Sequence, residues 1–444
     1  MIRLIPMLRF QLQKIVSLKS FEYCYAVLLV FILTQGPVYK IWRTSELYTT
    51  IPITPTWQAS FILVQLPALV LLGQTFLRRD SVTIPMIFLL VFLGWMLGSA
   101  TWTNLSRFVV VDSVGLVMTA FAGLYLGSRF TIFEIASIFW FGCQTGVGVA
   151  YYAIKSSWTD SIDSQGNWVG IYFNRNSLAP VAMIALVGAV IIALRLWKVA
   201  SKAHRWNVFA GLILFSSINL TVYVKSGSRT AAFALLIAVC FLAFWYQAEK
   251  IMIRPTSNPW QQRASYTFLL ATFIVGVWQI FRFQDVIGGL LNTADIFNGR
   301  SAIWNFSWGG FLERPIFGWG WRAAWETPEF LKRDLLWSTA GAAWSHNGYL
   351  EILLGGGIIG FFWFLMYLIS ATIAIMMRDE PQGARGIRFG SIAFVCAAST
   401  QESFFVGNHF LWLLLVSVLT PGCFRPMQLQ LRKHWQKSRA QSVQ

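Results

Sequence analysis

The chain has 444 residues, of which 56% are hydrophobic and only 12% are charged, and its mean hydropathy is +0.57. A soluble domain carries roughly 25% charged residues, so this composition excludes an ordinary soluble protein. Apolar runs long enough to cross a bilayer recur along almost the whole chain, without the alternating pattern of a transmembrane β-barrel. A polytopic, all-α membrane protein is expected.

The formal net charge of +17 would suggest a nucleic-acid partner if the protein were soluble. Here the lysines and arginines lie in short turns between apolar runs, so membrane lipids are the expected partner and nucleic acid is not. The five cysteines lie mostly within apolar runs and show no CxxC spacing. Neither a disulfide framework nor a metal site is indicated.

The chain begins with a basic amphipathic segment, residues 1–20, which is expected to lie along the cytoplasmic membrane surface. About twelve apolar spans follow, and the last two are short enough to form a hairpin that does not fully cross. Their expected positions are 21–39, 58–76, 83–100, 108–126, 131–153, 177–196, 206–224, 229–247, 265–281, 347–375, 387–402 and 404–421.

These spans set the domain organisation. Transmembrane helices one to nine are expected in residues 21–281, and helices ten to twelve in residues 347–421. Between them lies one long external loop, residues 282–346, with short helices of its own. Residues 422–444 form a basic cytoplasmic tail.

The distribution of basic residues predicts the orientation. Most of the 35 lysines and arginines, including those of 195–205 and 424–439, fall in segments that are cytoplasmic when the N-terminus is inside. The positive-inside rule therefore predicts N-in and C-in. Loops 154–176 and 282–346 then lie outside the cytoplasm.

Several arginines in or beside these external loops run against that rule. Arg175 lies in NWVGIYFNRNSLAP, Arg229 in KSGSRTAAF, Arg300 in FNGRSAIW, and Arg322 follows RPIFGWG. Any one of them could anchor a lipid headgroup. Together they could form an electropositive pocket, because the planar guanidinium binds phosphate oxygens in pairs.

The external loop ends in WSHNGYLEILLGGGIIG, where polar groups stand at the start of an apolar run. Ser345 is expected to cap that helix and to place His346 in its first turn, where the helix dipole favours a neutral imidazole that can accept a proton. The alternative is a histidine that only caps the helix or reaches the interface. Asn347 and Glu351 are possible supporting residues, and Glu351 could pair with an arginine or orient its neighbours.

Certain motifs are missing from the sequence. It has no P-loop, no Rossmann glycine pattern and no outward carboxylate cluster, so neither a nucleotide cofactor nor a metal is expected. One neutral histidine beside several arginines suits transfer of a sugar from a lipid diphosphate. The diphosphate needs charge neutralisation, and the acceptor hydroxyl needs a base.

The same segments resemble the O-antigen ligase and polysaccharide polymerase superfamily, most closely its exopolysaccharide-production branch. WSHNGYLEILLGGGIIG is similar to its HNxxLEIL signature, and four further motifs follow its order: GSATWTN, NWVGIYFNRNSL, SGSRTA and NGRSAIW with RPIFGWG. The match in order and spacing extends from about residue 95 to about residue 360.

The resemblance implies a GT-C-type glycosyltransferase of the bacterial cytoplasmic (inner) membrane, acting in cell-envelope polysaccharide biosynthesis. Its donor would be a glycan on undecaprenyl or another polyprenyl diphosphate, its acceptor a glycan or lipid-glycan, and its transfer metal-independent and inverting. His346 would be the base, Arg229 and Arg300 would bind the diphosphate, and Arg175 would add a phosphate or glycan contact. The run Gly355-Gly356-Gly357 departs from the family pattern and would loosen the helix start.

Two other classes of function stay open on the sequence alone. A lipid-linked glycan flippase, or another polytopic transporter, would also need outer arginines and many spans, but it predicts matching broken helices in two halves. A structural subunit of an export machine would use the external loop only to dock other assembly or export proteins. Within the enzyme class, the sequence does not separate polymerase from ligase.

Overall fold

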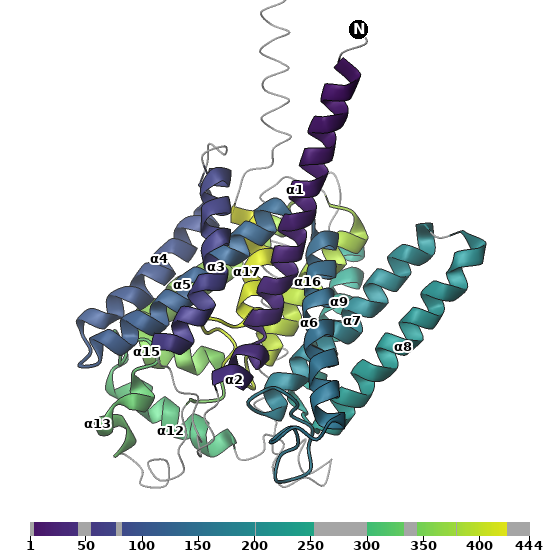
Figure 1. Ribbon diagram of the computed structural model, residues 1–444. Helices are drawn as coiled ribbons and strands as arrows, with labels where there is room; N and C mark the ends of the chain where they lie inside the picture. The colour runs from purple at the N-terminus through teal and green to yellow at the C-terminus, as the bar shows by residue number, and fades with distance from the viewer. Residues whose placement is uncertain are drawn as a thin grey trace, which may run out of the picture.

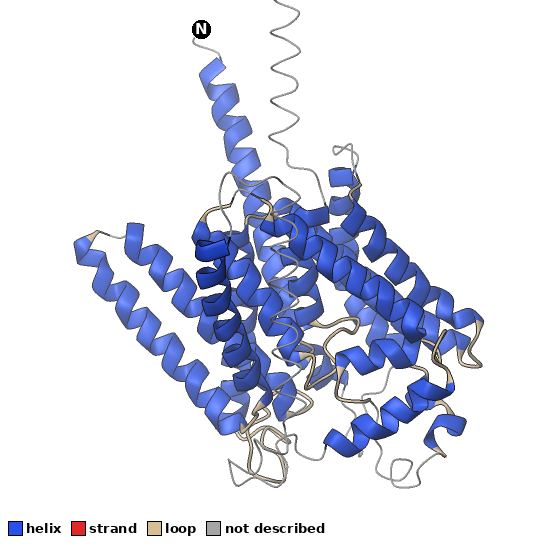
Figure 2. Ribbon diagram, turned by 180° about the vertical axis from the view of Figure 1, so that it is seen from behind, coloured by secondary structure: helices blue, strands red, loops and turns tan. Residues whose placement is uncertain are grey.

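The computed structural model describes residues 4–42, 55–76, 82–199, 201–252, 300–332, 344–378 and 380–423. These ranges are helical throughout, apart from loops and one isolated β-bridge between Ile162 and Trp168 (Figure 2). The expectation of an all-α chain is confirmed for these ranges. The span expected at 265–281 lies outside them.

The helices follow the apolar runs of the sequence. They are α1 (Leu4–Leu33), α2 (Gly36–Trp42), α3 (Pro55–Phe76), α4 (Ile84–Gly98), η1 (Ser99–Thr101), α5 (Ser106–Arg129), α6 (Ile132–Lys155), α7 (Arg175–Val199), α8 (Lys202–Ser226), α9 (Thr230–Met252), α12 (Arg300–Glu313), η2 (Ala324–Glu326), α13 (Pro328–Leu331), α15 (Gly348–Met376), α16 (Gln382–Ala398) and α17 (Phe410–Cys423).

Seven of the described helices are long and apolar enough to cross a membrane: α3, α4 extended through η1, α5, α6, α7, α8 and α15. Shorter apolar stretches lie in α9 and α17. The protein is therefore a polytopic integral membrane protein. The segment expected over 1–20 and the span expected from residue 21 are continuous in α1, which projects beyond the bundle (Figure 1).

The centre of the bundle is the pair α5 and α17. Every residue of α17 is buried. Gly123 and Gly127 of α5 face this helix, and a Cβ at Gly127 would lie 2.3 Å from the carbonyl oxygen of Ser417. The two glycines, four residues apart, allow the backbones to approach closely, as small residues do where membrane helices pack.

Helix α15 is interrupted at Gly357, whose backbone (φ 62°, ψ −165°) is essentially open only to glycine. The segment 315–320 docks at this break: Trp319 donates its N–H to the carbonyl of Leu354 at 2.7 Å, and Ile358 donates to Pro315 at 2.8 Å. The sequence suggested that the glycine run would loosen the start of the helix, but the first turns of α15 are regular. The run creates a break nine residues after the helix begins, where the 315–320 segment is held.

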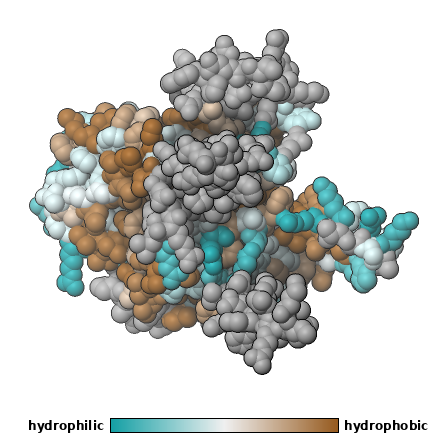
Figure 3. Space-filling model, turned by 90° about the horizontal axis from the view of Figure 1, so that it is seen from above, coloured by the Kyte–Doolittle hydropathy of each residue, from teal (hydrophilic) through white to brown (hydrophobic). Residues whose placement is uncertain are grey.

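The two ends of the bundle differ in character. Helices α12 and α13 and the 156–174 loop gather at the end opposite the N-terminus (Figure 1). The α7–α8 turn projects near the N-terminal end, and seen from that end it carries hydrophilic side chains, whereas apolar side chains cover much of the bundle (Figure 3). Basic residues of this turn include Arg195, Lys198, Lys202 and Arg205.

Candidate functional site

A single buried carboxylate links the predicted site residues. Glu402, 5% exposed, lies in the loop between α16 and α17. Its Oε1 accepts hydrogen bonds from Arg300 Nη2 at 2.6 Å and Asn176 Nδ2 at 2.7 Å, and its Oε2 lies 2.8 Å from His346 Nδ1. Burial raises the pKa of this carboxyl, but His346, Arg300 and Asn176 outweigh it and leave the pKa below its ordinary value.

The protonation of Glu402 fixes the tautomer of His346. Two atoms approach Nδ1, Glu402 Oε2 at 2.8 Å and the indole nitrogen of Trp344 at 3.0 Å, and Nδ1 cannot both donate and accept. With its lowered pKa the carboxylate has no proton to give, so Nδ1–H must donate to it. The Nε2 lone pair of a neutral His346 is then free to accept a proton.

The backbone around His346 is held from both sides. His346 has a φ of +51°, a left-handed conformation that costs a residue with a Cβ roughly 1–2 kcal/mol. Just before it, the N–H and hydroxyl of Ser345 both donate to the carboxylate of Glu351. Just after it, Asn347 caps α15 by accepting from the N–H groups of Tyr349 and Leu350.

One expectation is corrected at the start of α15. Asn347, not Ser345, is the cap of α15, so His346 lies before the helix rather than in its first turn. Of the two roles left open for Glu351, the hydrogen bonds fit the second, because Glu351 orients its neighbour Ser345; Ser345 is buried and its hydroxyl also donates to the carbonyl of Asn347. The first turn of α15 therefore supports the histidine through the backbone.

Four helix N-termini converge on Glu402. Arg300 begins α12 and donates to Thr230, the first residue of α9, at 3.4 Å. Asn176 lies in the first turn of α7, and His346 lies just before α15. Side chains at or next to these four helix N-termini thus meet around one carboxylate, and helix N-termini favour negative charge.

The two arginines expected to bind a diphosphate differ in their surroundings. Arg300 is 8% exposed and also donates to Gln401 at 3.0 Å. Arg229, next to Thr230, is exposed, and no hydrogen bond or ion pair of its side chain is found among the described residues. The side chain of Arg229 is therefore exposed, whereas that of Arg300 is buried and paired with Glu402.

Arg175 lies beside the same turn but leans toward the 156–174 loop. Its Nη1 donates to Gln165 at 3.4 Å and lies 4.0 Å from where a Cβ on Gly227 would sit. Asp163 interacts with its charge: burial raises the pKa of the Asp163 carboxyl, but hydrogen bonds from Asn167 and Gln165 and the charge of Arg175 together hold the pKa below its ordinary value. The structure brings Arg175 near Arg229 but not to Glu402.

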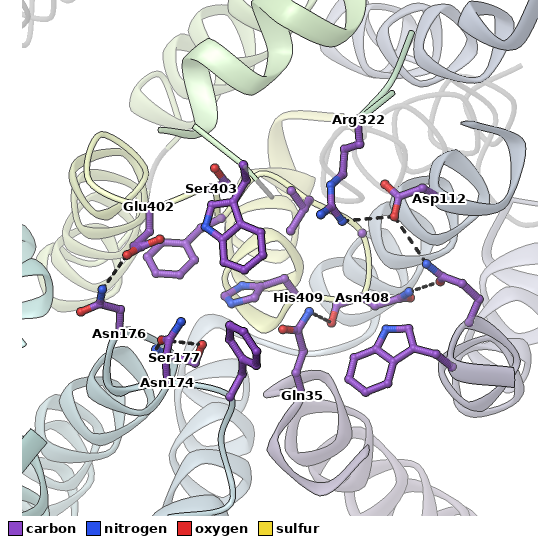
Figure 4. A pocket seen from close by; sticks show the side chains of 17 residues that line it. Gln35, Asp112, Asn174, Asn176, Ser177, Arg322, Glu402, Ser403, Asn408 and His409 are labelled. Carbon is purple, nitrogen blue, oxygen red and sulfur yellow. Dashed lines mark hydrogen bonds and ion pairs between the residues drawn. The ribbon is translucent and has the colours of Figure 1, made fainter. Parts of the chain in front are cut away.

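Arg322 lies apart from the other arginines. It has a φ of +56°, and its Nη1 lies 3.3 Å from Asp112 Oδ1 of α5. Arg322 and Asp112 line one side of a cavity of about 90 Å³, and Asn174, Asn176 and Glu402 line the other (Figure 4). Between them lie Gln35, Asn408 and His409.

Left-handed backbone is concentrated at this site. Of the six non-glycine residues with positive φ in the described ranges, four line the cavity or contact its walls: Gln35, Arg322, His346 and Asn408. Such conformations persist where the surrounding structure imposes them, and they cluster at functional sites. The same ranges contain no group of three or more His, Cys, Asp or Glu side chains arranged to hold a metal ion.

Residues 214–365 match the family model described as O-antigen ligase. The chain carries an O-antigen ligase domain. The match supports, for this part of the chain, the resemblance to the O-antigen ligase and polysaccharide polymerase superfamily drawn from the motifs. The protein is therefore a membrane enzyme of surface polysaccharide biosynthesis. No curated protein matches the chain.

The O-antigen ligase domain contains only part of the site. Arg229, Arg300, Arg322 and His346 lie within 214–365, whereas Glu402 lies beyond it. The sequence interpretation did not identify Glu402, which stands in AASTQESFF between two apolar runs. Burying a carboxylate between two apolar runs costs free energy unless a cation or hydrogen-bond donor pairs with it. The position of Glu402 could therefore have indicated a paired, functional carboxylate.

Proposed function

We propose that the protein transfers a glycan from a polyprenyl diphosphate to a sugar hydroxyl of an acceptor, as a GT-C-type transferase of about twelve spans. One observation carries this proposal: the carboxylate of Glu402 contacts both His346 and the buried Arg300. The Nε2 atom of His346 stays available, and residues of four helix N-termini surround the carboxylate. A base and an anion site side by side are what glycosyl transfer from a diphosphate requires.

The chemistry follows from these positions. His346 Nε2 takes the proton of the acceptor hydroxyl, and the oxygen attacks the anomeric carbon of the donor sugar. The bond from that carbon to the phosphate oxygen breaks, its electrons stay on the diphosphate, and the configuration inverts. Arg229, with Arg175 behind it, meets the phosphates from the exposed side, while Arg300 neutralises charge from the buried side.

The proposal includes a location. The site lies at the end of the bundle opposite the N-terminus (Figure 1), and the basic α7–α8 turn lies near the N-terminal end. With the N-terminus and C-terminus in the cytoplasm of a bacterium, the site opens at the outer face of its inner membrane, where nucleotide sugars are not available but lipid-linked donors are. A lipid-borne donor can reach such a site from the bilayer.

Replacement of His346 tests the proposal. His346→Ala is expected to reduce glycan transfer by at least about 100-fold, since a positioned base contributes about 10²–10⁴-fold, while membrane levels and donor binding stay near wild type. His204→Ala is the matched control, because His204 lies exposed near the N-terminal end of the bundle and contacts only Ser201 among the described residues. Near-normal transfer by His346→Ala would remove it as the base.

Analysis of lipid-linked glycans in a deletion strain separates the remaining functions. Single repeat units on the carrier would indicate a polymerase, and long polymer stranded on the carrier would indicate a ligase. Loss of outward-facing donor would instead indicate a flippase and contradict the proposal. Metal-independent transfer is part of the proposal, so loss of activity with EDTA and its return with Mg²⁺ or Mn²⁺ would contradict that part.

A further inference from the structure

The cavity beside His346 has the chemistry of a sugar-binding site. Its walls carry five amide side chains, Gln35, Gln58, Asn174, Asn176 and Asn408. Amides both donate and accept hydrogen bonds, as sugar hydroxyls also do. Aromatic rings complete the walls, including Trp57, Phe173 and Trp344, and give the flat apolar surface on which a sugar ring packs.

The charges of the cavity point to a neutral occupant. Asp112 and Glu402 oppose a single cation, Arg322, among the lining residues, and Arg322 is paired with Asp112. Neither Arg229 nor Arg300 lines the cavity. A diphosphate would meet no surplus positive charge here, whereas a hydroxyl-rich ring would find donors and acceptors.

The amides are fixed in place by one another. Asn408 donates through Nδ2 to Gln58 Oε1 and accepts at Oδ1 from Gln65 Nε2 at 2.9 Å. Gln35 Nε2 donates to the carbonyl of Asn408 at 3.2 Å. Apolar side chains could fill this space without the desolvation cost of a buried polar network, so its presence together with left-handed backbone at Gln35 and Asn408 indicates a binding role.

The position of the cavity indicates which sugar it binds. It shares Trp344 and Glu402 with the site, and His346 contacts both of these residues. Glu402 turns Oε1 toward Arg300 and Oε2 toward His346, and neither Arg229 nor Arg300 lines the cavity, so the two arginines proposed to bind the diphosphate lie outside it. We propose that the cavity binds the terminal sugar of the acceptor and presents its hydroxyl to His346, an inference that rests on the proposed transferase function.

The cavity has a volume of about 90 Å³, which is well above the space that a single water needs. Its polar and aromatic lining is concentrated over this small region. We expect the acceptor subsite to contact the terminal sugar of the acceptor most closely.

Binding of simple glycosides to the full-length protein in lipid nanodiscs tests the inference. The probes are methyl glycosides of hexoses, N-acetylhexosamines and 6-deoxyhexoses, measured by saturation-transfer difference NMR. Gln35→Gly removes one amide and suits the φ of +71° at this position, so the variant is expected to fold. It should bind the preferred glycoside about three- to tenfold more weakly than the wild type, the loss expected for one hydrogen bond.

Two further variants control this result. Ser157→Gly also introduces glycine at a residue with positive φ (+52°), but at an exposed position in the 156–174 loop that does not line the cavity, and it should bind as the wild type does. Trp57→Leu removes a stacking face and should weaken binding about tenfold, whereas Trp57→Phe should retain most of it. Absence of glycoside binding by the wild type, or equal binding by Gln35→Gly, would overturn the inference.

Transfer kinetics separate this inference from the function on which it rests. Gln35→Gly should raise the KM for acceptor and leave the KM for the lipid-linked donor unchanged. A rise in the donor KM instead would assign the cavity to the donor glycan and overturn the acceptor assignment. Glycoside binding that depends on Gln35 in a protein without any transfer activity would contradict the proposed function while leaving the sugar site in place.

Discussion

At the scale of single residues, Arg229 and Arg300 differ in exposure, and this difference predicts different effects of replacing them. Arg229→Ala is expected to weaken donor binding about 10- to 100-fold with little loss of stability, since a hydrogen bond to a charged group contributes about 1.5–3 kcal/mol. Arg300→Ala should also lower Tm, because it leaves Glu402 buried with less compensating charge.

Donor binding and thermal unfolding, measured on the same preparations, check this prediction. Arg229→Lys should restore only part of the affinity, because lysine cannot bind phosphate through a planar fork. Arg300→Ala combined with Glu402→Gln should regain stability without regaining donor affinity. Wild-type donor affinity in both alanine variants would refute the diphosphate assignment.

The pKa of Glu402 predicts a pH dependence of stability. Because its folded-state pKa lies below the ordinary 4.5, the carboxylate stabilises the fold fully above that pH, and the contribution is lost as pH falls through the lower folded value. Glu402→Gln should therefore lower Tm by the same amount from pH 7 down to about pH 5, and by less at lower pH. A Tm difference that does not shrink on acidification would show that Glu402 is not held as a carboxylate.

At the scale of elements, the break in α15 predicts that Gly357 cannot be replaced. A Cβ at this position would lie 2.1 Å from the carbonyl oxygen of Ile316, in a backbone conformation that side chains rarely adopt. Gly357→Ala should destabilise the fold by about 2 kcal/mol or more and detach the 315–320 segment. Thermal unfolding and protease susceptibility of that segment would measure both effects.

Gly94 of α4 is the matched control. It is a helical glycine with no atom near the place of its missing Cβ. Gly94→Ala should leave stability unchanged or raise it by up to about 1 kcal/mol, because alanine favours a helix over glycine. Equal effects of the two substitutions would show that the break at Gly357 is not structurally required.

The sequence predicted the elements better than their junctions. Apolar runs located the described membrane helices, because a bilayer imposes length and hydropathy on each of them locally. The end of α1 at Thr34 and Gln35 was not predicted, because it depends on contacts between distant segments. One such contact joins Gln35 to Asn408, which are far apart in the chain. The cap at Asn347 was assigned to Ser345 instead, although its hydrogen bonds to Tyr349 and Leu350 are local.

The site was predicted in part for the same reason. The order of the motifs predicted His346, Arg229 and Arg300 as site residues. In the structure, His346 and Arg300 both contact the carboxylate of Glu402. Glu402 and the amides Gln35, Gln58 and Asn408 belong to no motif that the sequence displayed, whereas Asn174 and Asn176 lie in NWVGIYFNRNSL. Their roles arise only when α3, α7 and the 399–409 loop are packed together.

At the scale of the whole molecule, the orientation of the bundle is open to a direct test. A C-terminal reporter that is active only in the cytoplasm, such as a fluorescent protein, should be active, and a phosphatase fusion at the same end should not. A single cysteine replacing Ser157 should react with a thiol reagent that does not cross the membrane. The opposite pattern would place the site in the cytoplasm and exclude the proposed donor arrangement.

Helix α8 links the surroundings of the molecule to its chemistry. Only 11% of its apolar stretch is buried against the described residues. Its C-terminal end is the Gly227 turn, two residues before Arg229. Because few described contacts hold α8, we expect extraction into detergent to disturb the position of Arg229 before it disturbs the buried α5–α17 core.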